Sequence, residues 1–116
     1  MSTMRNSVML IGRPGTDPEM KNFDNNQRVA RFRLAVNETY TNEENERIEN
    51  TQWISITAWN GLADRVMKIV RKGFMVAIEG SLRNNEWTDK DGNRRSAVEV
   101  VLSDMMPVDF EKKQAD

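Results

Sequence analysis

The sequence ARFRLAVN at residues 30–37 alternates apolar with charged or polar side chains more clearly than any other stretch of the chain. Its alternating apolar positions are Ala30, Phe32, Leu34 and Val36. A period of two is typical of a β-strand with one face in a core and the other in water or against a ligand. Arg31 and Arg33 therefore share the outer face of this predicted strand.

A second predicted strand, TQWISITAW at residues 51–59, divides its side chains in an unusual way. One face carries Ile54, Ile56 and Ala58, and the other carries Trp53, Ser55, Thr57 and Trp59. Burying the second set would place two hydroxyls in the core and expose two isoleucines, which costs several kcal/mol. The pattern therefore predicts that Trp53 and Trp59 point outward, about 20 Å apart along the extended strand.

Apolar runs and turn residues place the other elements. Further strands are predicted at residues 8–11 (ended by Gly12 and resuming at 19–23), 74–82 and 96–102. A helix is predicted at 62–70 between an Asn60 cap and Gly73, an exposed polar loop at 41–50, and a hairpin turn at Asp91-Gly92. This order predicts an all-β fold with one short helix, a five-stranded antiparallel Greek-key OB-fold barrel. Residues 1–104 form the predicted domain and residues 105–116 a short charged tail.

The composition argues against catalytic and metal chemistry. The 116 residues include no cysteine and no histidine, so thiolate nucleophiles, disulfides, the commonest general base and the commonest zinc ligand are excluded. No apolar run is long enough to span a bilayer, and residues 1–7 lack the apolar segment of a secretory signal. We therefore expect a cytoplasmic protein that is not an enzyme and that uses no cofactor or metal.

The net charge of −1 conceals an uneven distribution. Residues 1–36 hold six Arg or Lys and three Asp or Glu, whereas residues 37–51 hold one basic and five acidic residues. Such a mildly basic body can bind a phosphate backbone locally. The candidate phosphate contacts are Arg31, Arg33, Lys72, Arg83, Arg94 and Arg95. A solvated surface role stays open for each, although Arg31 and Arg33 are favoured because they share a face.

Four aromatic residues are the candidate binding residues: Tyr40, Trp53, Trp59 and Trp87. Tyr40 lies where the first alternating strand gives way to a polar loop, and Trp87 lies beside the predicted hairpin turn. Aromatic rings stack on any nucleic-acid base, so outward-facing rings favour binding of a single strand without sequence preference. The pattern alone also leaves open a protein interface and a place in the core.

The ordered motifs resemble the bacterial single-stranded DNA-binding protein family over about residues 6–102. They are VMLIGR at 8–13, DPE at 17–19, FRLAVN at 32–37, TQWI at 51–54, RKG at 71–73, IEGSLR at 78–83, WTDKDG at 87–92 and EVV at 99–101. The resemblance implies base stacking by the four aromatics, and a DNA path along Lys72, Arg83, Arg95 and Lys21. It also implies a homotetramer that protects single strands at the nucleoid during DNA replication, recombination and repair.

Relatives of this kind end in a long linker and an acidic tip that recruits replication and repair proteins. This sequence stops at residues 111–116 without either feature, so we do not carry recruitment over. Two other binding functions stay open: an OB-fold primosomal or replication accessory protein, and an RNA chaperone. A third alternative is a scaffold whose aromatic face binds protein.

Overall fold

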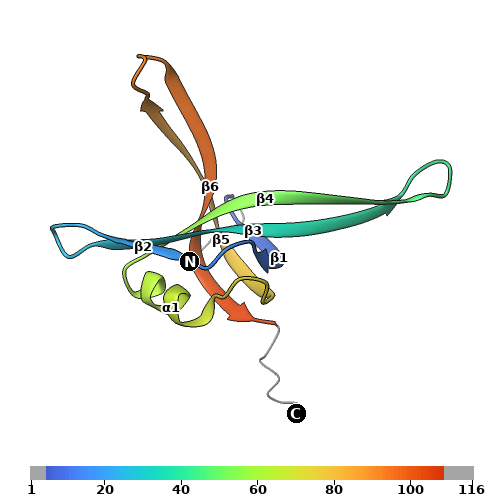
Figure 1. Cartoon of the computed structure of the whole chain (residues 1–116), viewed down its shortest axis with the longest axis horizontal. Coiled ribbons are helices and arrows are strands. Elements are labelled where there is room, and N and C mark those ends of the chain that lie inside the picture. The colour runs from blue at the N-terminus through green and yellow to red at the C-terminus, as the bar shows by residue number, and fades with distance from the viewer. Residues whose placement is uncertain (1–4, 109–116) are drawn as a thin grey trace, which may run out of the picture.

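A computed structural model of the chain describes residues 5–108 (Figure 1). Its strands are β1 (Val8–Pro14), β2 (Glu19–Asn22), β3 (Arg28–Thr41), β4 (Arg47–Trp59), β5 (Val76–Thr88) and β6 (Arg94–Pro107). One helix, α1 (Gly61–Ile69), connects β4 to β5. Within the described residues, no helix is long and apolar enough to cross a membrane.

Five of the strands close into a barrel. The sheet runs in the order β1-β5-β6-β4-β3, and β1 returns to pair with β3 through Arg13 and Ala35. β2 pairs only with β3 and extends the sheet on that side. The predicted barrel is confirmed, with one parallel pairing, between β4 and β6, among otherwise antiparallel neighbours. The chain passes through α1 and β5 between β4 and β6, so β6 can return along β4 in the same direction.

The core lies where the alternation at residues 30–37 predicts it. Phe32, Leu34 and Ile56 are buried, and Phe32 pairs directly with Ile56 across β3 and β4. From the opposite side of the barrel, β5 contributes Ile78 and β6 contributes Val100. Removing these side chains from water is the main favourable contribution to folding.

Helix α1 packs Val66 against this core, and the following residue of its stripe, Val70, is also buried. The helix ends at Ile69, and the Arg71 guanidinium donates to the carbonyl oxygens of Met67 and Val70. A cation at the C-terminal end of a helix is favourable because the unpaired carbonyls carry partial negative charge. The Arg71 side chain thus satisfies carbonyl groups at the end of α1 that have no partner within the helix.

The predicted role of Asn60 as a side-chain cap is wrong. Asn60 occupies the N-cap position with φ of 55° and makes no side-chain cap hydrogen bond. Its Oδ1 instead accepts a hydrogen bond from the backbone N–H of Arg28 on β3, at 3.1 Å. The Arg28 guanidinium in turn donates to the carboxylate of Asp64 in the first turn of α1, and this contact lowers the pKa of Asp64. The helix start is thus tied to β3 rather than capped by its own side chain.

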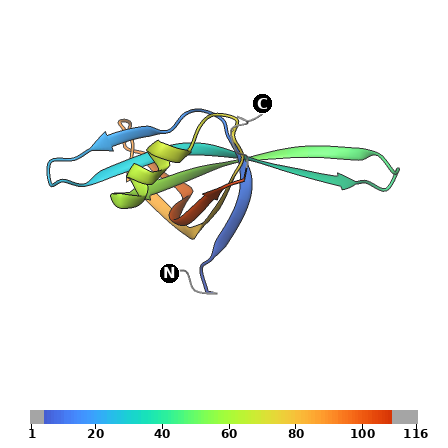
Figure 2. The same ribbon diagram turned by 90° about the horizontal axis from the view of Figure 1, so that it is seen from below.

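Two long hairpin arms leave the barrel in different directions, one formed by β3 and β4 and the other by β5 and β6 (Figures 1 and 2). The predicted loop at 41–50 is wrong at both ends, since Thr41 pairs with Arg47 and the strands continue inward from there. The turn itself is closed by the Asn42 side chain, whose Oδ1 accepts hydrogen bonds from the backbone N–H groups of Glu44 and Glu46. A polar sequence can form a ladder in solvent because the two strands satisfy each other's backbone groups.

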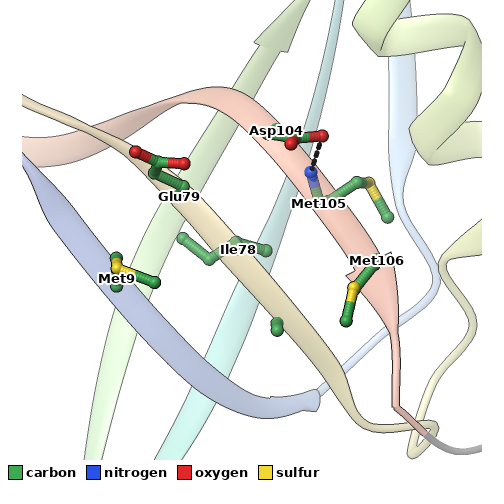
Figure 3. Close-up of a pocket in the computed structure, with 7 residues that line it drawn as sticks. Met9, Ile78, Glu79, Asp104, Met105 and Met106 are labelled. Atoms are coloured by element: carbon green, nitrogen blue, oxygen red, sulfur yellow. Dashed lines mark hydrogen bonds between the residues drawn. The ribbon is translucent and has the colours of Figure 1, made fainter. Parts of the chain in front are cut away.

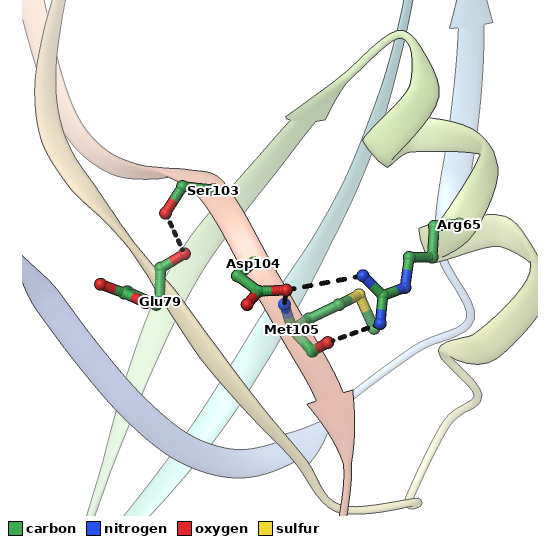
Figure 4. Close-up of polar contacts among 5 residues, drawn as sticks. All are labelled: Arg65, Glu79, Ser103, Asp104 and Met105. Carbon is green, nitrogen blue, oxygen red and sulfur yellow. Dashed lines mark hydrogen bonds and ion pairs between the residues drawn. The ribbon is translucent and has the colours of Figure 1, made fainter. Parts of the chain in front are cut away.

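The end of β6 corrects the predicted boundary between domain and tail. β6 runs to Pro107, and Met105 is buried in the core, one residue beyond the boundary at 104. The Arg65 side chain on α1 donates to the Met105 carbonyl at 3.0 Å and lies 3.5 Å from the Asp104 carboxylate (Figure 4). Residues 105–107 therefore belong to the barrel, and residues 109–116 of the predicted tail lie outside the described residues.

We expect Gly80→Ala to destabilise the barrel by about 1–3 kcal/mol, the usual range for overpacking. A Cβ at Gly80 would lie 2.2 Å from the Val101 carbonyl oxygen and 2.8 Å from a Val100 methyl group. Gly61→Ala is the matched control, because a Cβ there meets nothing within 4 Å. Urea unfolding monitored by circular dichroism measures both variants, and equal midpoints would contradict the packing at Gly80.

Candidate nucleic-acid interface

Trp53 is the central side chain of the outer face of β4. Its ring is 50% exposed, although Ile54 beside it is partly buried and packs on the core. The ring lies so close to Gly15 that a Cβ there would approach Cζ3 to 2.5 Å. The Arg33 guanidinium lies over the ring, 5.5 Å from its centroid. The prediction that Trp53 faces outward is confirmed, and Gly15 and Arg33 hold the ring in place.

A hollow of about 230 Å³ lies next to Trp53 on the same face. Arg31 and Arg33 from β3 line it, together with Ser55 from β4, Thr16 and Glu19. The register explains this arrangement, because Arg33 pairs with Ser55 and alternation turns both outward. The structure therefore brings the two favoured arginines together between Trp53 and the far end of β4.

Trp59 occupies that far end, but it is less exposed than Trp53. Its ring stacks with Phe23, with a centroid separation of 6.2 Å and an interplanar angle of 21°. The Lys21 ammonium lies 5.4 Å from the centroid of the Phe23 ring. Phe23 was not predicted as a site residue from the sequence. Its position at the end of the predicted 19–23 strand could have indicated an exposed aromatic ring. Trp59 and Lys21 are therefore neighbours across an aromatic ring that is itself partly exposed.

Thr57 departs from the prediction for the outer face of β4, since it is buried. Its hydroxyl donates to one carboxylate oxygen of Glu99 on β6 at 2.9 Å. The Asn85 side chain on β5 donates to the other oxygen at 2.8 Å. Glu99 thus joins the outer face of β4 to one face of the β5–β6 arm. The sequence could not predict this burial, because the parallel β4–β6 pairing that covers Thr57 is a long-range contact.

Trp87 lies on the β5–β6 arm and is 49% exposed. Alternation along β5 places it on the same face as Asn85 and Arg83, and Arg95 is its partner on β6. This face continues into the outer face of β4 at Glu99. Arg94 lies on the opposite face of the arm, where it pairs with Glu86. Of the two adjacent arginines, the structure therefore places only Arg95 beside Trp87.

The Arg95 guanidinium is already paired. It donates from Nε to the Asp89 carboxylate at 2.8 Å. This bond, together with the backbone N–H groups of Asn93 and Asp91, lowers the pKa of Asp89. A phosphate that binds Arg95 must therefore compete with a carboxylate.

Tyr40 and Lys72 lie apart from the arm that carries Trp87. Tyr40 is 56% exposed near the end of β3, and its register partner is Ile48. Alternation puts Tyr40 on the side of β3 opposite to that of Arg33, so it does not share the outer face with Trp53. The backbone N–H of Lys72 donates to the Asp17 carboxylate at 2.9 Å. Asp17 follows Gly15 by two residues in the sequence. The bond therefore holds Lys72 near the segment that contacts Trp53.

Comparison with known proteins agrees with this geometry. The profile of the single-strand binding protein family matches residues 5–108. The chain is 36% identical over 100 residues to the single-stranded DNA-binding protein of Neisseria meningitidis serogroup A, covering 86% of this chain and 58% of that protein. It is 41% identical over 101 residues to single-stranded DNA-binding protein 1 of Chlorobaculum tepidum, covering 86% of this chain and 62% of that protein.

The chain thus spans about three fifths of the length of these curated relatives. Among solved structures, the Plasmodium falciparum protein described as an SSB complex with ssDNA superposes with a TM-score of 0.82 at 32% identity. The match covers 94% of this chain and 99% of that one. With its closed barrel, its outward-facing Trp53 and these similarities, the chain belongs to the single-strand binding protein family.

Proposed function

We propose that this chain binds single-stranded DNA without sequence preference and protects it during replication, recombination and repair. The observation that carries the proposal is Trp53, a half-exposed ring that Gly15 and Arg33 hold on the outer face of β4. A ring fixed before binding loses little conformational freedom when a base stacks on it. No bond of the DNA is broken in this function, so the proposal includes no catalytic residue.

The DNA strand would follow a path of aromatic and basic side chains, which we call the aromatic path. It consists of Trp53, the hollow lined by Arg31 and Arg33, Trp59 with Phe23, and Trp87. From Trp53 one branch runs along β4 to Trp59, and the other crosses the Glu99 junction to Trp87. Each base that stacks on an aromatic ring contributes about 1–3 kcal/mol, with little dependence on base identity. We include Tyr40 as a separate stacking position on the β3–β4 arm, because its ring is exposed.

Phosphates would be bound by the basic side chains that face this path. The resulting set is Lys21, Arg31, Arg33, Lys72, Arg83 and Arg95. Neutralising phosphates releases condensed counterions, so affinity should fall as salt rises. Arg94 leaves the set, since its position on the other face of the arm, paired with Glu86, does not support a contact there.

We also propose that the chain acts as a homotetramer in the cytoplasm, at the nucleoid. An apolar surface on β1, β5 and β6 supports assembly, with Met9 77% exposed and Met106 and Ile11 also exposed. A hollow of about 190 Å³ lies between Met9, Ile78, Met105 and Met106 (Figure 3). Exposed apolar side chains gathered in this way often mark a protein interface, and Glu79 and Asp104 lie at the same hollow. We propose that the partner at this surface is a second copy of the chain.

The decisive experiment is a titration with poly-dT that follows tryptophan fluorescence at low salt. We expect quenching, because stacked bases quench an exposed indole. Trp53→Ala and Trp87→Ala should each weaken binding by about 1–3 kcal/mol without unfolding the barrel. Val98→Ala is the control, since Val98 is exposed on the same arm as Trp87 but pairs with Asn84 on the opposite face.

An unchanged signal at low salt would contradict DNA binding altogether. Tighter binding of rU than of dT oligomers would favour an RNA chaperone. If Trp53→Ala abolished capture of a protein while poly-dT was never bound, the aromatic face would be a scaffold instead.

The salt dependence of DNA affinity should distinguish basic residues that contact phosphates from those that do not. In plots of log affinity against log salt, Arg33→Gln and Arg83→Gln should each reduce the slope by about 0.7, the value for one phosphate contact on a single strand. Arg94→Gln changes the net charge equally but removes a side chain from the other face, so its slope should equal that of the unmodified chain. Identical slopes for all three variants would contradict the path along Arg33 and Arg83.

The assembly can be measured without DNA. Met9→Glu places a charge in the apolar surface, so light scattering should give a lower mass for this variant than for the unmodified chain. Val98→Ala should leave the mass unchanged. A monomeric mass for the unmodified chain would contradict the homotetramer and leave the DNA titration unaffected.

A further inference from the structure

The junction between β4 and α1 contains the pair Asn60-Gly61. It directly follows Trp59, and no other asparagine of the chain precedes a glycine. Both residues are exposed, and a Cβ at Gly61 would meet nothing within 4 Å. Gly61 is the first residue of α1, a position whose N–H has no acceptor within a helix. The backbone nitrogen of Gly61 is therefore sterically accessible to its neighbour.

The backbone of Asn60 is arranged for attack by that nitrogen. Its ψ angle is −118°. Around the Cα–C bond of an L-residue, Cβ is offset from the backbone nitrogen by a third of a turn, so this ψ eclipses Cβ with the Gly61 nitrogen. The four atoms Cβ, Cα, C and N then lie in one plane, as they do in a five-membered succinimide ring. A rotation about Cα–Cβ brings the side-chain Cγ to the nitrogen.

Neighbouring contacts support this conformation. In the resting conformation the Asn60 Oδ1 accepts a hydrogen bond from the Arg28 N–H, which ties the junction to β3. The Asn60 N–H donates to the Arg28 carbonyl, and the Asp64 N–H donates to the Asn60 carbonyl. These bonds keep the positive φ and the eclipsed ψ that an unfolded chain rarely adopts.

We propose that Asn60 deamidates spontaneously in the folded protein. The Gly61 nitrogen forms a bond to Cγ and loses its proton, while the bond from Cγ to the side-chain nitrogen breaks and ammonia leaves. Water then opens the succinimide. Hydrolysis at Cγ gives aspartate, and hydrolysis at the main-chain carbonyl gives isoaspartate, in which the backbone runs through Cγ. No oxidant or reductant takes part.

Both products place a new carboxylate next to Trp59. Charged groups of the described residues near it are the Arg28 guanidinium and the Asp64 carboxylate, which pair with each other, Lys68 on the next turn of α1, and Lys21 beyond Phe23. The isoaspartate product also lengthens the connection between β4 and the helix by one methylene. If the proposed aromatic path holds, this charge lies beside phosphates at Trp59 and weakens DNA binding there.

Peptide mass spectrometry tests the chemistry directly. The full chain is incubated at mildly alkaline pH, and the peptide that contains residue 60 is compared with the one that contains Asn45. Asn45 is exposed and has φ of 66°, but Glu46 follows it. We expect conversion of amide to carboxylate at Asn60 only, with isoaspartate detected by enzymatic methylation. In heavy-oxygen water the new carboxylate should carry the label.

Two comparisons keep the proposal falsifiable. Gly61→Ala should retain the fold and lose the conversion, because a methyl group shields the nitrogen. The folded chain should convert at least as fast as the same chain in urea, since the fold supplies the eclipsed ψ. Slower conversion in the folded chain than in urea, or equal conversion at Asn45, would overturn the proposal.

The effect on binding rests on the proposed function and is measured separately. Asn60→Asp should weaken poly-dT binding several-fold at low salt, and the difference should shrink at high salt as charges are screened. Asn50→Asp adds the same charge to the other side of β4 and should have a smaller effect. If conversion occurs and both variants bind equally, the chemistry stands and the path past Trp59 fails. If no chain binds poly-dT, only the proposed function fails.

Discussion

The register between β3 and β4 pairs Phe32 with Ile56 and Leu34 with Ile54, and both pairs turn the same side of the sheet toward the barrel interior. A shift of one residue would move every apolar side chain to the other face, so burial fixes this register strongly. The opposite face follows automatically, with Arg33 beside Ser55 and Ala35 beside Trp53. The outward placement of Trp53 beside Arg33 is thus a consequence of core packing, and the contacts with Gly15 and Arg33 then fix the ring.

Barrel closure completes the surface in a second step. β6 pairs in parallel with β4, which covers Thr57 and brings Glu99 between Thr57 and Asn85. The half-buried Glu99 carboxylate accepts two hydrogen bonds, and leaving it there without partners would cost free energy. Glu99 thus adds a polar contact between the β5–β6 arm and the outer face of β4, beside the backbone pairing of β6 with β4.

Local pattern was enough to predict the elements whose burial alternates along the chain. The alternation at residues 30–37 and the division of Trp53 from Ile54 both survive in the structure. Pattern failed where strands extend into solvent, because residues 42–50 have no apolar face to signal a ladder. It also failed at Asn60, where a tertiary bond to Arg28 replaces the local cap, and at Met105, whose burial requires the partner strand β5. Phe23 could have been predicted, whereas its stacking on Trp59 could not.

In the proposed DNA path, the pairing of Arg95 with Asp89 would make the Asp89 carboxylate a competitor of the DNA phosphates. When a phosphate displaces that carboxylate, the ion that leaves stays attached to the protein and can return at once. The contact between Arg95 and a phosphate would therefore contribute little binding free energy and would break quickly. The hollow beside Trp53, lined by two arginines, would hold the strand meanwhile. A contact that releases readily, beside one that holds, would let the protein shift along the DNA strand without dissociating from it.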